Sequence, residues 1–104
     1  MQEKFKIELT NSEKITCLEE IKKRIVRSLY VYEKSQEYEL YDYKEYIRNL
    51  IIFISSANDI LEGSLVNIKV NLNSILQNNF EKRQFKTIIF ECKNYIDYLL
   101  KDGD

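Results

Sequence analysis

The sequence has 104 residues, of which 44% are hydrophobic and 32% charged, and its formal net charge is −1; this balance is typical of a globular protein and excludes a disordered one. It contains no histidine, no proline and only two glycines, Gly63 and Gly103. These absences exclude a glycine-rich phosphate loop and remove both the usual general base and the commonest metal ligand. We expect a single helical domain spanning residues 1–104.

The two cysteines, Cys17 and Cys92, have no metal-type spacing, and we expect both to be buried free thiols in a reducing cytoplasm. The segment Met1–Leu9 alternates charged and apolar residues, unlike a signal peptide. The uncharged apolar run from Asn49 to Asn58 is half the length of a bilayer span. We therefore expect a cytoplasmic protein with no cofactor, no bound metal and no membrane association.

In chain order, residues 4–9 alternate in polarity and predict a short strand or an extended arm. A capping box follows, because the Thr10 hydroxyl and the Glu13 carboxylate can each accept a backbone N–H at a helix start. Residues 34–41 have no clean period and predict a connection. Between the box and this connection we predict a helix over roughly 11–34, because one apolar face repeats every three or four residues: Ile15, Leu18, Ile21, Ile25, Leu29 and Tyr32.

A second helix start is indicated by Asp42 and Glu45, an acidic version of the capping box. Tyr41 and Tyr46 lie where a hydrophobic staple would close around this start. Gly63 supplies the left-handed residue that commonly ends a helix. The predicted inner face contains Ile47, Leu50, Ile54, Ala57 and Leu61, widened by Ile51 and Phe53.

Residues 64–79 fit two patterns. Ser64 would cap a helix whose inward residues are Leu65, Ile68, Leu72, Ile75 and Leu76. Alternation from Val66 to Leu72 also fits a strand, but the helical face extends further and the neighbouring segments are helical, so we favour a helix. After the break at Asn78 and Asn79, a last helix is predicted with an inner face of Phe85, Ile88, Cys92, Ile96 and Leu99, flanked by Ile89 and Leu100.

Together these elements predict an all-α protein, an antiparallel four-helix-type bundle of three long helices and one shorter element, with a short N-terminal extended arm. The alternative is an α+β fold in which residues 4–9 and 65–72 form a small two-stranded element. In the bundle, the end of the first helix and the start of the second lie at the same end.

No group of residues indicates catalysis or metal binding. Glu19 and Glu20 are matched by bases four residues later, which is typical of a solvated helix face. The inner faces carry no acids for an all-carboxylate metal site, and no histidine can complete a di-metal motif. Cys92 is expected to be buried and therefore inert. We expect that the protein is not an enzyme.

One modest group of bases consists of Lys22, Lys23, Arg24 and Arg27 on the first helix with Lys82, Arg83 and Lys86 on the last. The acids among them favour a mixed, solvated surface. The functional alternative is a weak phosphate-binding patch where the two helices meet. Since the chain has no overall surplus of Lys and Arg, we do not expect nucleic acid to be its main partner.

The segment from Tyr30 to Tyr46 holds six of the eight tyrosines, interleaved with five acids and only two lysines. Tyrosine supplies apolar area with a polar tip and loses little rotamer freedom, so interfaces favour it. Acids around it would steer a basic partner. A structural interpretation also fits, with Tyr41 and Tyr46 as a staple and Tyr32 against the core. The predicted partner-binding residues are Glu33, Glu37, Tyr38, Glu39, Tyr41, Asp42, Tyr43 and Glu45.

We expect a small protein-binding domain, and the leading hypothesis is an inhibitor or immunity-type protein that neutralises a basic partner such as a nuclease toxin. Fourteen isoleucines and nine asparagines indicate AT-rich codons. Its size, acidity and codon usage are similar to those of many bacterial immunity proteins, antitoxins and phage anti-defence proteins, a resemblance of type without a family motif. The alternatives are an assembly subunit of a homo- or hetero-oligomer, a phage anti-defence protein and a weak nucleic-acid-associated module.

Overall fold

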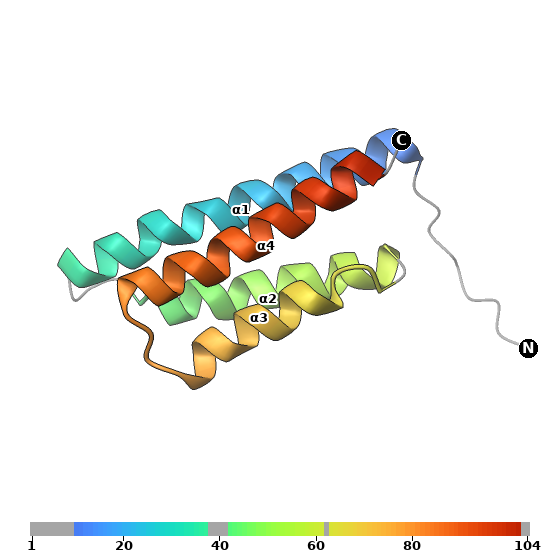
Figure 1. Cartoon of the computed structure of the whole chain (residues 1–104). Coiled ribbons are helices and arrows are strands. Elements are labelled where there is room, and N and C mark those ends of the chain that lie inside the picture. The colour runs from blue at the N-terminus through green and yellow to red at the C-terminus, as the bar shows by residue number, and fades with distance from the viewer. Residues whose placement is uncertain (1–9, 38–41, 62, 103–104) are drawn as a thin grey trace, which may run out of the picture.

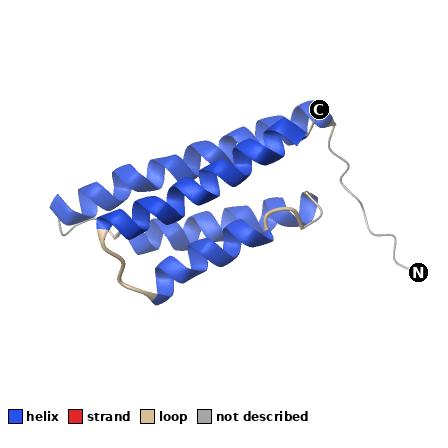
Figure 2. Cartoon of the chain, in the orientation of Figure 1, coloured by secondary structure: helices blue, strands red, loops and turns tan. Residues whose placement is uncertain are grey.

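The computed structural model describes residues 10–37, 42–61 and 63–102, and these contain four helices and no strand (Figures 1 and 2). The helices are α1 (Asn11–Glu37), α2 (Tyr43–Ile60), α3 (Val66–Gln77) and α4 (Lys82–Asp102). The predicted antiparallel bundle of three long helices and one shorter helix is confirmed. The predicted arm at residues 4–9 lies outside the described residues.

The helices form two layers, with α1 beside α4 in one and α2 beside α3 in the other (Figure 1). Contacts join α1 to α2, α2 to α3, α3 to α4 and α4 to α1, so each helix packs against two neighbours around a common core. The end of α1 and the starts of α2 and α4 lie at one end of the bundle (Figure 1). The start of α1 and the end of α4 lie together at the other.

The predicted capping box begins α1. The Thr10 hydroxyl accepts from the backbone N–H of Glu13 at 3.2 Å, and the Glu13 carboxylate accepts from the Thr10 N–H at 3.0 Å. These hydrogen bonds to Thr10 favour the charged carboxylate and lower the pKa of Glu13. The helix runs three residues past the predicted end at Lys34, because Tyr32 is buried and holds the last turns against the core.

The start of α2 confirms half of the second predicted box. The Asp42 carboxylate accepts from the backbone N–H of Lys44 at 2.9 Å. The Glu45 carboxylate instead pairs with the Arg48 guanidinium at 2.6 Å, so the reciprocal half of the box was wrongly predicted. A charged donor one turn away competes well against a neutral backbone N–H. Tyr41, the other half of the predicted staple, lies outside the described residues.

The link from α2 to α3 follows the glycine signal but not the predicted serine cap. Gly63 has φ of 82° and donates its N–H to the Asn58 carbonyl oxygen at 2.9 Å, which ends α2 as predicted. Leu65, not Ser64, is the N-cap of α3, and its N–H is accepted by the Asn58 side chain at 2.8 Å. The Asn58 amide therefore replaces the hydroxyl that we expected to cap this helix.

The segment 66–77 is helical, so the strand alternative for residues 65–72 is wrong. Ile68, Leu72 and Ile75 face the core at helical spacing, whereas Val66 and Val70 are 50% and 62% exposed. In a two-stranded element Val66, Ile68, Val70 and Leu72 would share one face. The observed division of these residues between core and solvent follows a helical period instead.

The core lies along the inner faces of all four helices, and the predicted faces are largely confirmed. Two details differ. In α4, Ile88 was predicted on the inner face with Ile89 beside it, but Ile89 is fully buried and Ile88 is half-buried. Cys17 is half-buried at the edge of the core, not buried as predicted. The buried apolar residues are Leu18, Ile21, Ile25, Tyr32, Ile47, Leu50, Ile54, Ala57, Leu65, Ile68, Leu72, Ile75, Phe85, Ile89, Cys92 and Ile96.

Candidate protein-binding site at one end of the bundle

The predicted partner-binding residues that the structure describes lie around the end of the bundle where α1 finishes and α2 begins. Glu33, Asp42, Tyr43 and Glu45 are described by the structure. Glu37 is the last residue of α1, but its side chain is not described. Three of the eight, Tyr38, Glu39 and Tyr41, fall outside the described residues.

Tyr43 belongs to an aromatic cluster that joins three helices. Its ring meets Tyr32 edge-on with centroids 4.8 Å apart and Phe85 with centroids 5.6 Å apart. Tyr32 stacks on Phe85 at 4.4 Å. Burial is the main cause that raises the pKa of Tyr43. Because its ring packs in this cluster, Tyr43 offers only part of its surface to a partner.

Two further tyrosines of the segment also support the fold. The Tyr32 hydroxyl donates to the Phe80 carbonyl oxygen at 3.1 Å, which ties α1 to the link before α4. The Tyr46 hydroxyl donates to the Arg24 carbonyl oxygen at 2.7 Å, which ties α2 to the middle of α1. Tyr32 lies against the core, as the structural interpretation predicted. The predicted staple between Tyr41 and Tyr46 involves a residue outside the described ranges and stays a prediction.

Among the described tyrosines of this segment, Tyr30 faces solvent. It is 55% exposed on α1, one turn before Glu33, and the Lys34 ammonium lies over its ring at 5.5 Å. Residues three apart on a helix are neighbours, so Tyr30 and Glu33 form one aromatic and acidic surface. The sequence analysis placed Tyr30 in the tyrosine-rich segment but not among the binding residues.

A hollow of about 570 Å³ lies beside Glu33, lined by Tyr32, Glu33, Gln36, Glu81 and Lys82. The Glu33 carboxylate pairs with the Lys82 ammonium at 3.0 Å, and this contact holds the pKa of Glu33 below its ordinary value. Both side chains are about half-exposed, so water competes strongly for this pair. Glu81 is exposed. The sequence analysis did not place Gln36, Glu81 or Lys82 in the site. Glu81 directly precedes α4 and Lys82 begins it, and only the fold brings these two residues to Glu33.

The charge of the chain is unevenly distributed around this end. Residues 33–45 contain five acids and two bases, which gives −3, so the rest of the chain carries +2 to make the total of −1. Two of these acids, Asp42 and Glu45, already accept a backbone N–H and an arginine respectively. Hydrogen bonding does not cancel their charge. The start of α4 at the same end adds Lys82, Arg83 and Lys86 against Glu81, so the excess of acids belongs to residues 33–45. We call the end of the bundle that carries this segment the acidic end.

The predicted basic group is divided in the structure. Lys22 pairs with Asp97 at 2.7 Å near the end of α4, whereas Lys82 pairs with Glu33 at the start of that helix. Because α1 and α4 are antiparallel, the two halves of the group lie at different levels of the bundle. Arg24 lies over the Phe53 ring of α2 at 4.1 Å. These contacts favour the mixed, solvated surface over a joint phosphate patch.

Comparisons of the chain with models of known protein families, with curated proteins and with solved structures give no match. Within the described ranges, no three Cys, Asp or Glu side chains are grouped so that they could hold a metal ion. None of the described helices is both long and apolar enough to cross a membrane. Cys92 is fully buried, and burial is the main cause that raises its pKa to about 12.

Proposed function

We propose that this protein is a non-enzymatic binding domain of the inhibitor or immunity type, which holds a basic protein partner at the acidic end of the bundle. The hollow between the end of α1 and the start of α4 is the observation that supports this proposal. It combines the edge of Tyr32 with two acidic residues, Glu33 on α1 and Glu81 in the link directly before α4.

Such a hollow suits a lysine or arginine side chain from the partner. The charged head of the entering residue would lie between the two carboxylates, and its apolar stem would lie against the exposed edge of Tyr32. Lys82 already pairs with Glu33, but this ion pair is exposed, so a basic side chain of the partner can replace Lys82 at little cost in free energy. The exposed Tyr30 would extend the contact along α1.

A basic active cleft, as in a nuclease toxin, is the partner surface that this chemistry fits best. An acidic protein that covers such a cleft blocks access of the phosphate substrate without any catalytic group of its own. The −3 charge of residues 33–45 would also steer the encounter and raise the association rate.

The test is affinity capture from the native host, followed by binding kinetics with the purified captured protein. We compare the wild type with the double variant Glu33→Lys/Glu81→Lys. The matched control, Glu19→Lys/Asp59→Lys, changes the net charge equally at exposed acids away from the hollow. We expect the first variant to weaken binding at least tenfold, mostly through slower association, and the control to bind within about twofold of the wild type.

Three results would contradict the proposal. One is capture of no protein or only of acidic proteins. A second is an equal loss of binding in both double variants, which would indicate a general effect of net charge. The third is unchanged binding in the Glu33→Lys/Glu81→Lys variant when circular dichroism shows that it is folded.

A further inference from the structure

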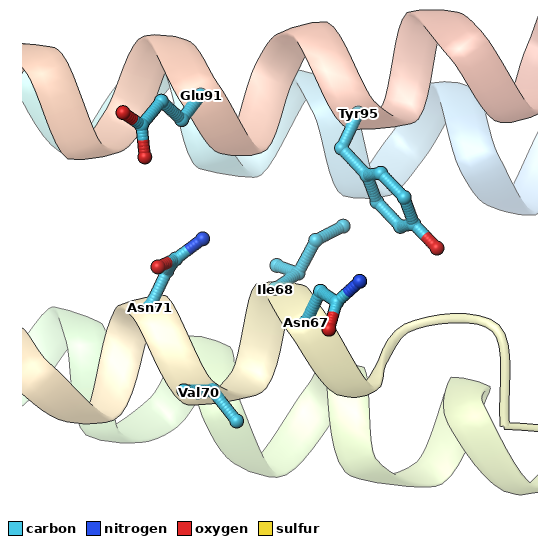
Figure 3. Close-up of a pocket in the computed structure, with 6 residues that line it drawn as sticks. All are labelled: Asn67, Ile68, Val70, Asn71, Glu91 and Tyr95. Atoms are coloured by element: carbon cyan, nitrogen blue, oxygen red, sulfur yellow. The ribbon is translucent and has the colours of Figure 1, made fainter.

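A second surface of the bundle lies along α3 and the groove that separates it from α4. The groove has a volume of about 340 Å³ and is lined by Asn67, Ile68, Val70, Asn71, Glu91 and Tyr95. Figure 3 shows the Asn71 side chain pointing toward α4, and those of Glu91 and Tyr95 pointing toward α3. Val70 lies at the rim of the groove and points away from α4. The groove thus has polar walls and an apolar outer edge.

That outer edge continues along α3 as an apolar ridge made of Val66 and Val70, which are 50% and 62% exposed. The two residues lie one turn apart on the same side of the helix. β-Branched residues are poorer helix formers than alanine or leucine. Their exposed position therefore gains nothing for α3 itself, which is consistent with a surface that is covered by another molecule.

This surface is also almost free of charge. The twelve residues of α3 include one charged side chain, Lys69, and the groove includes one, Glu91. No ion pair within the described residues uses either of them. The centres of protein interfaces are depleted of charge. A strongly charged partner has few charges to recognise here. Lys69 on α3 and Glu91 in the groove instead offer one charge of each sign.

We propose that the occupant of this surface is a second copy of the chain. The Val66–Val70 ridge of each copy lies in the α3–α4 groove of the other, and Lys69 of one copy approaches Glu91 of the other. Since ridge and groove adjoin on one molecule, a twofold axis uses each of them twice.

The size of the surface sets the strength of this association. A helix of twelve residues is about 18 Å long, and two packed helices are about 20 Å wide. Such a face buries roughly 1,000 Å² of accessible surface in a dimer, counted over both copies, which is at the low end for a specific interface. We therefore expect a dissociation constant in the micromolar range or weaker. The hollow at Glu33 and Glu81 shares no lining residue with this groove.

The test is sedimentation equilibrium of the full chain from about 5 to about 500 µM, a range that brackets a micromolar dissociation constant. We expect the wild-type mass to rise from that of one chain toward that of two. Lys69→Glu and Glu91→Lys should each weaken association by about tenfold, because each places two like-charged contacts in the dimer. The double variant Lys69→Glu/Glu91→Lys should return to within about threefold of the wild type.

Val70→Lys should abolish association, because it places a charge in the apolar ridge. The matched control is Ile52→Lys, which changes a 65% exposed aliphatic residue on α2 and should leave association unchanged. Circular dichroism confirms that each variant is folded. A wild type that stays monomeric throughout, a charge exchange that fails to restore association, or a control that weakens it as much as Val70→Lys would overturn the proposal. The acidic end is unaltered in all these variants, so this result and that of the capture experiment are independent.

Discussion

The Tyr95 hydroxyl donates a hydrogen bond to the Ser64 carbonyl oxygen at 3.1 Å and so ties α4 to the turn before α3. The two residues are 31 positions apart in the sequence, and Tyr95 also lines the α3–α4 groove. Without it, the Ser64 carbonyl would have to find another donor at a partly buried position.

Tyr95→Phe should lower the free energy of unfolding by about 1 kcal/mol, since it leaves the Ser64 carbonyl without this donor. For a domain of this size, the melting temperature should fall by about 4–8 °C. Thermal unfolding followed by circular dichroism measures this change. Tyr30→Phe is the control, because Tyr30 is exposed and its ring contact with Lys34 does not need the hydroxyl. Equal shifts in both variants would contradict the assignment.

Cys92 predicts a loss of stability at alkaline pH. Its pKa is raised to about 12 by burial, above the ordinary value of 9.0, so the folded protein binds this proton more tightly than the unfolded chain. The contribution of Cys92 is therefore complete below pH 9 and is lost as pH rises toward the folded pKa, at about 1.4 kcal/mol per pH unit. Urea unfolding of the wild type and of Cys92→Val at several pH values should show a steeper decline in the wild type. Parallel pH profiles would argue against this origin.

Gly63 predicts a pair of substitutions that separate backbone strain from packing. A Cβ atom at this position would meet no atom within 4 Å, yet φ is +82°, where L side chains are disfavoured. Gly63→Ala should therefore cost about 1–2 kcal/mol through the backbone alone. Gly63→Asn should cost less, because asparagine tolerates the left-handed region. Chemical denaturation measures both, and a larger loss for asparagine would indicate a steric cause.

Tyr30 and Tyr32 should separate binding from folding. Tyr32 is 6% exposed and packs against Tyr43 and Phe85, so Tyr32→Ala should lower the free energy of unfolding by about 3–5 kcal/mol. Tyr30 is exposed, and Tyr30→Ala should change stability by about 0.5 kcal/mol or less. If Tyr30 contributes to the proposed interface, its loss should weaken binding of the captured basic partner about tenfold. Unchanged affinity would remove Tyr30 from that surface.

The helices were predictable because their signals are local. Thr10 with Glu13, Asp42 at the start of α2 and Gly63 at its end each act within a few residues, and the structure places all three as expected. The period of the apolar residues also identified α3 as a helix, although Val66 to Leu72 alternates like a strand. The longer helical face was the better guide, because a short alternating run fits both a strand and a helix, whereas the helical period continues to Leu76.

What the sequence did not predict depends on contacts between distant segments. Asn58 caps α3 in place of Ser64 because the turn brings its amide back to Leu65. Tyr43 looks like a surface residue in a polar segment, yet Tyr32 and Phe85 meet it from α1 and α4. The hollow at Glu33 needs Glu81, almost fifty residues later, and no periodicity along one helix can indicate such a neighbour.

The first turn of α1 and the last turn of α4 lie side by side, at the end of the bundle opposite the hollow (Figure 1). Each helix contacts the next one along the chain, and α4 contacts α1, so the same set of helix contacts could be made by a chain that starts at a different helix. The chain could be circularly permuted, with the end of α4 joined to the start of α1 and new termini opened in the link between α3 and α4. Such a molecule would keep every helix neighbour, and a reporter domain placed on the new joint would sit far from the acidic end.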